Sequence, residues 1–273
     1  MRTVLAMSQG MDGGDDNPRS SKNLGLVKAA LWGFEAVYVT VMFLSDKSPG
    51  NDIFHTTPET WKLALDLSIN FWLIMPILTP QLCPVVNPTI EAIFNIIVSW
   101  GLLNFCFLSD ERGQKVSLIP FVIGSAFLTN VFNIVYLAIR DPNPTPVSVR
   151  KGDIEDTKAL RVAESRTYPL VLGIVGALSV AWFFVGRPSE LGDVSERVKS
   201  FVNLVQTDRL TFSFLLDAVV FWAFQGALVK DDMSRRRWKD TRAGWVARTV
   251  PYFGLVYYLM VRPSLYDEDR SSV

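Results

Sequence analysis

Histidine, cysteine and net charge are all scarce in this sequence. The 273-residue chain has one histidine and two cysteines, and its 27 Lys and Arg residues balance 27 Asp and Glu residues. A single histidine excludes sites that need two, such as HExxH zinc sites and bis-histidine haem. Two cysteines exclude a four-cysteine metal site and a disulfide scaffold. The lack of a basic excess argues against a nucleic-acid partner.

Catalytic motifs are also missing. The sequence has no GxSxG elbow, no P-loop and no GxGxxG fingerprint, and no pair of carboxylates stands in a recognisable acid–base frame. We therefore name no catalytic residue and no metal ligand. The motif search leaves catalysis open and favours a protein that is not an enzyme.

What the chain does have is long apolar stretches. A bilayer core about 30 Å thick needs roughly 20 helical residues to cross it. Val116–Ile139 and Thr167–Val185 are apolar on all sides, which is typical of membrane helices rather than of a soluble bundle. We predict an all-α, multi-pass transmembrane helix bundle of about six spans, within a range of five to seven. The expected spans are Leu24–Leu44, Pro88–Leu108, Val116–Ile139, Thr167–Val185, Leu210–Val229 and Trp245–Val261, with Leu63–Leu78 as a weaker seventh.

Polar segments divide the rest of the chain. Residues 1–23 read as a mobile N-terminal segment, 24–262 as a single transmembrane domain and 263–273 as a C-terminal tail. Residues 140–166 form a polar connection. Residues 193–206 carry valines at helical spacing opposite charged residues, which predicts an amphipathic helix on the membrane surface. The alternative is a surface helix packed on a soluble part.

The positive charges fix the expected topology only weakly. Seven spans would divide the Lys and Arg residues of the connections 15 to 10 between the two sides, and six spans would divide them 14 to 11. In both cases the connections 140–166 and 230–244 share a side. That side is cytoplasmic or stromal if the positive-inside rule holds.

Asp217 is the foremost candidate for a polar site inside the membrane. It shares a helical stripe with Ser213 and Gln225, and the first expected span contains Lys28 and Glu35. An ionisable group at membrane depth is expensive and therefore a functional candidate. The functional interpretation is a proton or ion relay or a polar ligand site. The structural interpretation is a hydrogen bond or ion pair between helices.

Arg248 is the nearest basic residue along the chain, but the helix geometry separates it from Asp217. Counted from the short 230–244 connection at 1.5 Å per residue, Asp217 lies about 18 Å deep and Arg248 about 5 Å deep. The mismatch of roughly 13 Å is too long for the two side chains to bridge. We predict that a donor from a non-neighbouring stretch holds Asp217. The partners left open are Lys28 or Glu35 on the first expected span and Asn130 or Asn133 on the third.

Two stripes of small and hydroxyl residues predict close helix packing. Such residues let helices approach each other closely in membranes. The first stripe is Gly173, Ala177 and Ala181, and the second is Ser125, Thr129 and Asn133.

Two strings of the sequence resemble a known family. Residues 87–144, which begin NPTIEAIF and end IRDPNP, and residues 208–236, DRLTFSFLLDAVVFWAFQGALVKDDMSRR, resemble small multi-pass membrane proteins of cyanobacteria and of plant and algal plastids. The resemblance implies a helical bundle in a photosynthetic membrane and no particular reaction. Residues 1–23 depart from a transit peptide because they are short and rich in acidic residues.

Three functions follow as expectations. The first is a structural subunit or assembly factor of a larger photosynthetic complex in a plastid or thylakoid membrane, with the bilayer and other membrane subunits as partners. Its aromatic residues would suit contact with chlorophyll or carotenoid. The second is a small transporter or channel that uses Asp217. The third is a membrane enzyme acting on a lipid or isoprenoid.

Overall fold

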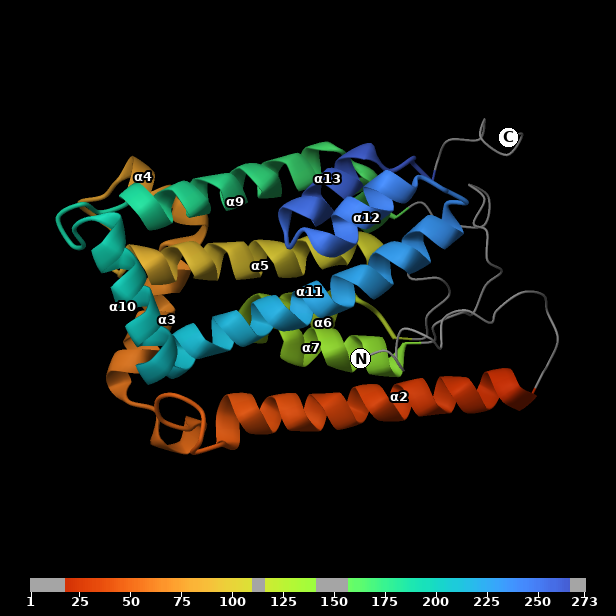
Figure 1. Ribbon diagram of the computed structural model, residues 1–273, viewed down its shortest axis with the longest axis horizontal. Coiled ribbons are helices and arrows are strands. Elements are labelled where there is room, and N and C mark those ends of the chain that lie inside the picture. The colour runs from red at the N-terminus through yellow and green to blue at the C-terminus, as the bar shows by residue number, and fades with distance from the viewer. Residues whose placement is uncertain (1–17, 110–115, 141–156, 266–273) are drawn as a thin grey trace.

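The computed structural model describes residues 18–109, 116–140 and 157–265, and within these ranges it is helical with no strand. Four helices are long and apolar enough to cross a membrane, as an integral membrane protein requires. They lie side by side along the long axis of the molecule (Figure 1). These spans are Leu24–Leu44, made of α2 (Pro18–Val39) and the π-helical turn η1 (Thr40–Leu44), then α5 (Pro88–Leu108), α9 (Thr167–Val185) and α11 (Arg209–Arg235). The predicted six spans are therefore not confirmed.

Helix α5 is the centre of the bundle. It begins at Asn87-Pro88, where the Asn87 side chain accepts a hydrogen bond from the backbone N–H of Thr89. Two thirds of its apolar stretch is buried, against 17% for α2. Its Trp100 ring packs between aromatic rings of α11 and of the C-terminal helices. The core therefore forms around α5, and α2 stands at its edge.

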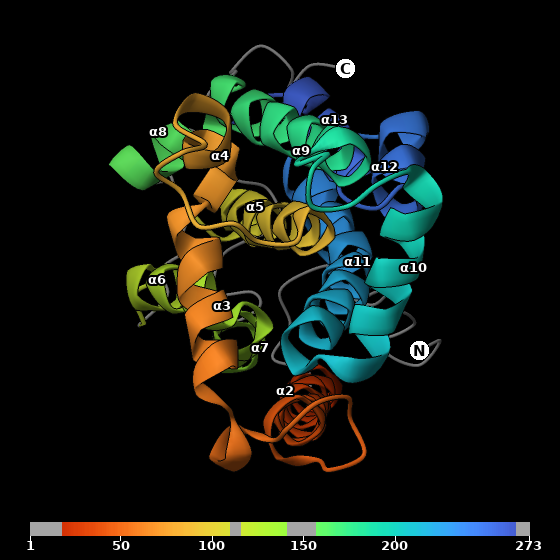
Figure 2. The ribbon, with the colours of Figure 1, turned by 90° about the vertical axis from the view of Figure 1, so that its left-hand side faces the viewer.

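The weaker seventh span, Leu63–Leu78, is not one straight helix. The chain forms α3 (Pro58–Ile69), a 3-10 turn η3 (Phe71–Leu73) and α4 (Ile74–Leu78), with a bend of 42° between the two halves. Trp72 and Leu73 both have positive φ, which ends α3. Together with the 3-10 turn η2 (Ile53–His55), these elements lie at one end of the bundle, where α3 crosses the long helices (Figures 1 and 2).

The expected span Val116–Ile139 is wrong, because the chain folds back on itself at Thr129. It forms α6 (Ile119–Leu128) and α7 (Asn130–Ile139), which we call hairpin 1. The rings of Phe121 and Tyr136 lie 5.1 Å apart. In one continuous helix these residues would be separated by about 22 Å. Thr129 makes the reversal with φ 40°, and the apolar pattern of a re-entrant hairpin resembles that of a span.

The expected span Trp245–Val261 is wrong for the same reason. Its residues form α12 (Thr241–Thr249) and α13 (Phe253–Val261), which we call hairpin 2. Tyr252 has φ 54° and follows Pro251, which has no backbone N–H to continue a helix. The Arg262 guanidinium lies 3.2 Å from Asp232 near the end of α11, so α13 returns to the end where α12 begins.

The helix predicted over residues 193–206 is confirmed as α10 (Val194–Thr207), capped by the Asp193 side chain, and its place at the membrane surface stays a prediction. It lies across the end of the bundle beside α11, on the opposite side of α5 from α3 (Figure 2). Val194 and Val198 are exposed, and Arg197 is buried and donates to the Phe183 carbonyl near the end of α9. An apolar row facing outward at the end of a spanning bundle is typical of a helix in the membrane interface.

The remaining segment boundaries are refined by the structure. Helix α2 begins at Pro18, so the last residues of the expected mobile segment 1–23 are helical, and residues 1–17 lie outside the described ranges. Residues 141–156 of the polar connection also lie outside them, and the rest of the connection contains α8 (Lys158–Glu164). Of the expected tail 263–273, the structure describes residues 263–265.

Both hairpins enter and leave the bundle at the same end, which also holds α8. We call it the basic end and the other the α10 end. The described connections carry eleven Lys and Arg residues at the basic end and six at the α10 end, a clearer asymmetry than the sequence alone predicted. The former are Arg140, Lys158, Arg161, Arg166, Lys230, Arg235, Arg236, Arg237, Lys239, Arg242 and Arg262, and the latter are Lys47, Lys62, Arg187, Arg197, Lys199 and Arg209.

Candidate functional site

Asp217 lies where hairpin 1 turns, deep inside the bundle. Its side chain is 1% exposed and is reached by three donors from two other elements. The hydroxyl of Tyr38 on α2 donates to Oδ1 over 2.5 Å, and the Thr129 hydroxyl donates to Oδ2 over 2.6 Å. Asn130 Nδ2 donates to Oδ1 over 2.7 Å. Asp217 therefore joins α2, hairpin 1 and α11 at one point.

The local backbone of hairpin 1 presents this site. Thr129 is β-branched and its positive φ is a costly conformation for such a residue. That conformation lets its hydroxyl and the Asn130 amide reach the same carboxylate. Helix α7 begins at Asn130, so the positive end of its dipole lies beside Asp217. The hydrogen-bond donors around the carboxylate are all neutral.

The prediction that a distant stretch holds Asp217, rather than Arg248, is confirmed. Its donors stand 179, 88 and 87 residues away along the chain. Asn130 was among the partners that sequence reasoning left open. Tyr38 was missed, although its position three residues after Glu35 on the inner face of α2 was a usable signal.

The other predicted members of the polar site do not gather around Asp217. Ser213 donates to the carbonyl of Leu210 in its own helix. Lys28 is half-buried, and Glu35 is buried with Oε2 lacking a hydrogen-bond partner. In the described part of the chain, no hydrogen bond or ion pair connects Lys28 or Glu35 with Asp217.

Gln225 holds the turn of hairpin 2 instead. It lies two turns along α11 from Asp217, about 12 Å away. Its Nε2 donates to the carbonyls of Ala247 and Val250, at the end of α12, and its Oε1 accepts from Trp100 Nε1 over 2.9 Å. An amide that donates to the last carbonyls of a helix satisfies groups that would otherwise be unpaired. Gln225 thus acts as a neutral cap.

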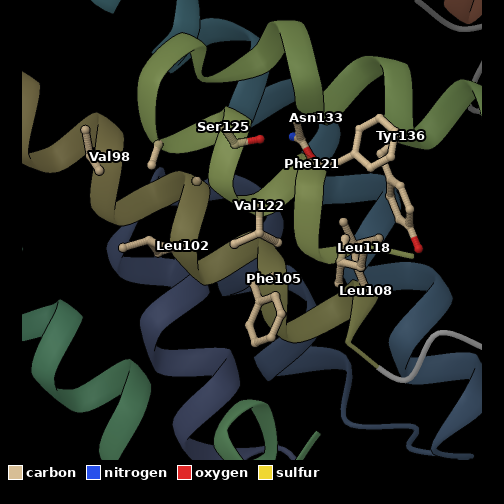
Figure 3. Close-up of a pocket in the computed structure, with 12 residues that line it drawn as sticks. Val98, Leu102, Phe105, Leu108, Leu118, Phe121, Val122, Ser125, Asn133 and Tyr136 are labelled. Carbon is tan, nitrogen blue, oxygen red and sulfur yellow. The ribbon is translucent and has the colours of Figure 1, made fainter. Parts of the chain in front are cut away.

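A narrow cavity lies between α5 and hairpin 1 (Figure 3). Its volume is about 20 Å³, which is room for about one water molecule. Ser125 on α6 and Asn133 on α7 line it and point toward each other. The expected stripe of Ser125, Thr129 and Asn133 on one helix is therefore wrong, because the helix breaks at Thr129.

The expected packing stripe on α9 is wrong in its second and third members. Gly173 is half-buried against Val256 of α13, but Ala177 and Ala181 are exposed. The packed side of α9 is turned away from them. It carries Pro169, Leu172, Val175, Gly176 and Ser179.

Three other buried carboxylates have arginine partners, unlike Asp217. Glu91 on α5 accepts two hydrogen bonds from Arg187, each 2.9 Å long. At the basic end, Glu164 and Asp232 share Arg236 and Arg262 at 2.7–3.2 Å. We call these last four residues the ionic cluster. Its charges balance, as a buried ionic group requires.

The ionic cluster shifts the titration of its members outside the spans. Burial raises the pKa of the Glu164 carboxyl, but the guanidinium groups of Arg236 and Arg262 outweigh burial and hold that pKa below its ordinary value. Burial lowers the pKa of Arg236, and the Asp232 and Glu164 carboxylates raise it above its ordinary value. These shifts favour the ionised forms of Glu164 and Arg236, and the cluster fastens α8, α11 and the end of hairpin 2.

Metal binding and known relatives add no further assignment. Within the described ranges, no group of three or more His, Cys, Asp or Glu side chains could hold a metal ion. Comparison of the chain with protein-family models, curated proteins and solved structures gives no significant match. The resemblance to plastid and cyanobacterial proteins stays a prediction.

Proposed function

We propose that this integral membrane protein moves protons across the membrane, with Asp217 as the group that accepts and releases them. The observation that carries the proposal is a buried carboxylate at a re-entrant turn whose donors are all neutral. A carboxylate at membrane depth is expensive and is a functional candidate by default. Transporters commonly place such groups where helices are broken.

The donors of Asp217 suit both protonation states. When the carboxylate is ionised, Tyr38, Thr129 and Asn130 all donate to it. When it is protonated, a hydroxyl group of Tyr38 or Thr129 can rotate and accept the new proton's hydrogen bond. Only the Asn130 amide hydrogen is fixed as a donor. The carboxyl group can therefore keep hydrogen bonds to its neighbours in both protonation states.

Proton flux in reconstituted vesicles tests the proposal. Purified protein is placed in liposomes containing a pH-sensitive dye, and a potassium gradient with valinomycin sets the membrane potential. We expect acidification above that of empty vesicles for the wild type, and the rate of empty vesicles for Asp217→Asn. Glu196→Gln, which removes an exposed carboxylate on α10, is the matched control and retains the flux. Sodium uptake in place of proton uptake would overturn the proton assignment.

A second candidate function is a subunit or assembly factor of a complex in a plastid or thylakoid membrane. The exposed side of α2 supports it, since Gly25 and Gly33 on that side have open space where a side chain would be. The likeness of residues 87–144 and 208–236 to proteins of photosynthetic membranes supports the location. Native gels after mild detergent test it. Migration as a lone 30.7 kDa protein without pigment or partners argues against it.

A further inference from the structure

A polar hollow of about 180 Å³ lies at the α10 end, apart from Asp217. It is enclosed by the loop after α2, the start of α3 and the junction of α10 with α11. The apolar stretch of α2 ends at Leu44 and α11 begins at Arg209, so the hollow is level with the lipid headgroups. Its polar side chains are Asn51, Thr56, Thr60, Thr207, Asp208 and Arg209.

Arg209 lines this hollow. Its terminal nitrogens donate to main-chain carbonyls of residues 41–50, including Val41 at 3.1 Å and Ser45 at 2.8 Å. These carbonyls follow the last turn of the first span, whose negative dipole end suits a cation. The Nε–H of Arg209 is buried and has no partner. Both terminal nitrogens of the guanidinium are therefore engaged, and its Nε–H is not.

Asp208 supplies the opposite charge beside it. Its Oδ2 accepts from the backbone N–H and the hydroxyl of Thr211, both over 2.6 Å, and so caps α11. An anion in the hollow would meet this carboxylate, and a cation would meet the Arg209 guanidinium. A neutral molecule with both donors and acceptors avoids both conflicts. Hydroxyl groups meet that requirement.

We propose that this hollow binds the uncharged, hydroxyl-rich headgroup of a membrane lipid, such as a hexose or glycerol unit. The segments beside the hollow favour a lipid over a soluble molecule. Trp61, next to Thr60 on α3, is 61% exposed, and Phe54 in η2 is 81% exposed. Exposed aromatic side chains at this level are typical of the belt that lies among headgroups. Acyl chains attached to the bound headgroup would extend along the spans.

Lipid retention by the full-length protein tests the proposal. The purified protein is mixed with a monohexosyl diacylglycerol, a phosphatidylglycerol and a diacylglycerol of the same acyl chains, and native mass spectrometry measures which lipid it keeps. We expect preferential retention of the hexosyl lipid. Thr60→Leu fills the hollow from α3 and should lower that retention about tenfold, which corresponds to about 1.4 kcal/mol.

Ser68→Leu is the matched control on the same helix. Ser68 is exposed and its hydroxyl donates to Ala64 in its own helix, so the change should leave retention unaltered. Equal retention of phosphatidylglycerol, or equal losses in both variants, would overturn the proposal. Competition by a free methyl hexoside supports the hydroxyl chemistry. Binding of that free sugar without any retention of the lipid would overturn the lipid as its source.

Discussion

The two re-entrant hairpins are held by different kinds of side chain at their turns and at their bases. The turn of hairpin 1 is held by the carboxylate of Asp217, and the cavity near its base has mainly apolar walls. The turn of hairpin 2 is held by the neutral amide of Gln225, and its base is fastened by the ionic cluster. Both turns bind the same helix, α11. A neutral side chain therefore suffices to hold such a turn, so the charge of Asp217 needs another explanation.

A substitution at the base of hairpin 2 should lower the free energy of unfolding the most. Arg236→Met removes one cation from the ionic cluster and leaves Glu164 and Asp232 sharing Arg262 alone. Breaking a buried ionic group in this way costs roughly 3–5 kcal/mol. Unfolding titrations in mixed micelles measure the loss in free energy of unfolding. A loss under about 1 kcal/mol would show that the cluster does not hold the hairpin.

The next largest loss of stability is expected when Gln225, the neutral cap of hairpin 2, is replaced. Gln225→Leu leaves the Trp100 N–H and the carbonyls of Ala247 and Val250 without their partner. Unpaired buried groups cost about 1–3 kcal/mol each, and partial repacking should limit the total to about 2–4 kcal/mol. Amide hydrogen exchange should rise in residues 241–261 and stay unchanged in hairpin 1. Equal increases in both hairpins would contradict the separate roles given to Gln225 and Asp217.

Acid should loosen hairpin 2 through Glu164. The pKa of this carboxyl is lower in the folded protein than in the unfolded chain, so its contribution to stability is fully present above the unfolded value of 4.5. The contribution is lost as the pH falls through the folded pKa. Thermal unfolding from pH 7 to pH 3 should show this decline, and Glu164→Gln should flatten it. If Glu164→Gln has the same pH dependence as the wild type, Glu164 is not the group responsible for the decline.

The smallest effect is expected on the outer side of α9. Ala177 is exposed, so Ala177→Leu should change the free energy of unfolding by no more than about 0.5 kcal/mol. The same substitution would destabilise the protein markedly if the small-residue stripe packed within the chain. Gly176→Leu is the comparison, because Gly176 is buried against the Tyr252 ring.

The sequence predicted the helical membrane class and identified Asp217 as a polar residue at membrane depth, but it did not predict the number of spans. Hydropathy shows that Val116–Ile139 and Trp245–Val261 are apolar. It does not show whether the chain crosses the membrane there or reverses. The reversals depend on positive φ at Thr129 and Tyr252, two residues that seldom adopt it. Pro251 is a local signal for such a break, whereas Thr129 has no comparable signal.

The sequence was sufficient to identify Asp217, but not the residues that surround it. Asp217 was identified because a charge within an apolar stretch is conspicuous. Its partner Tyr38 depends on how α2 packs against hairpin 1, which no local pattern encodes. The stripe Ser213, Asp217 and Gln225 was read as one site, but the structure gives its members three different partners.

The Asp217→Asn variant tests the central claim most directly. Its proton flux is measured together with amide hydrogen exchange at the turn of hairpin 1. An asparagine keeps the shape and one acceptor of the side chain, so residues 128–131 should remain protected as in the wild type. The account predicts that protection persists while the flux falls to that of empty vesicles. Flux at the wild-type rate in a folded Asp217→Asn protein would contradict it.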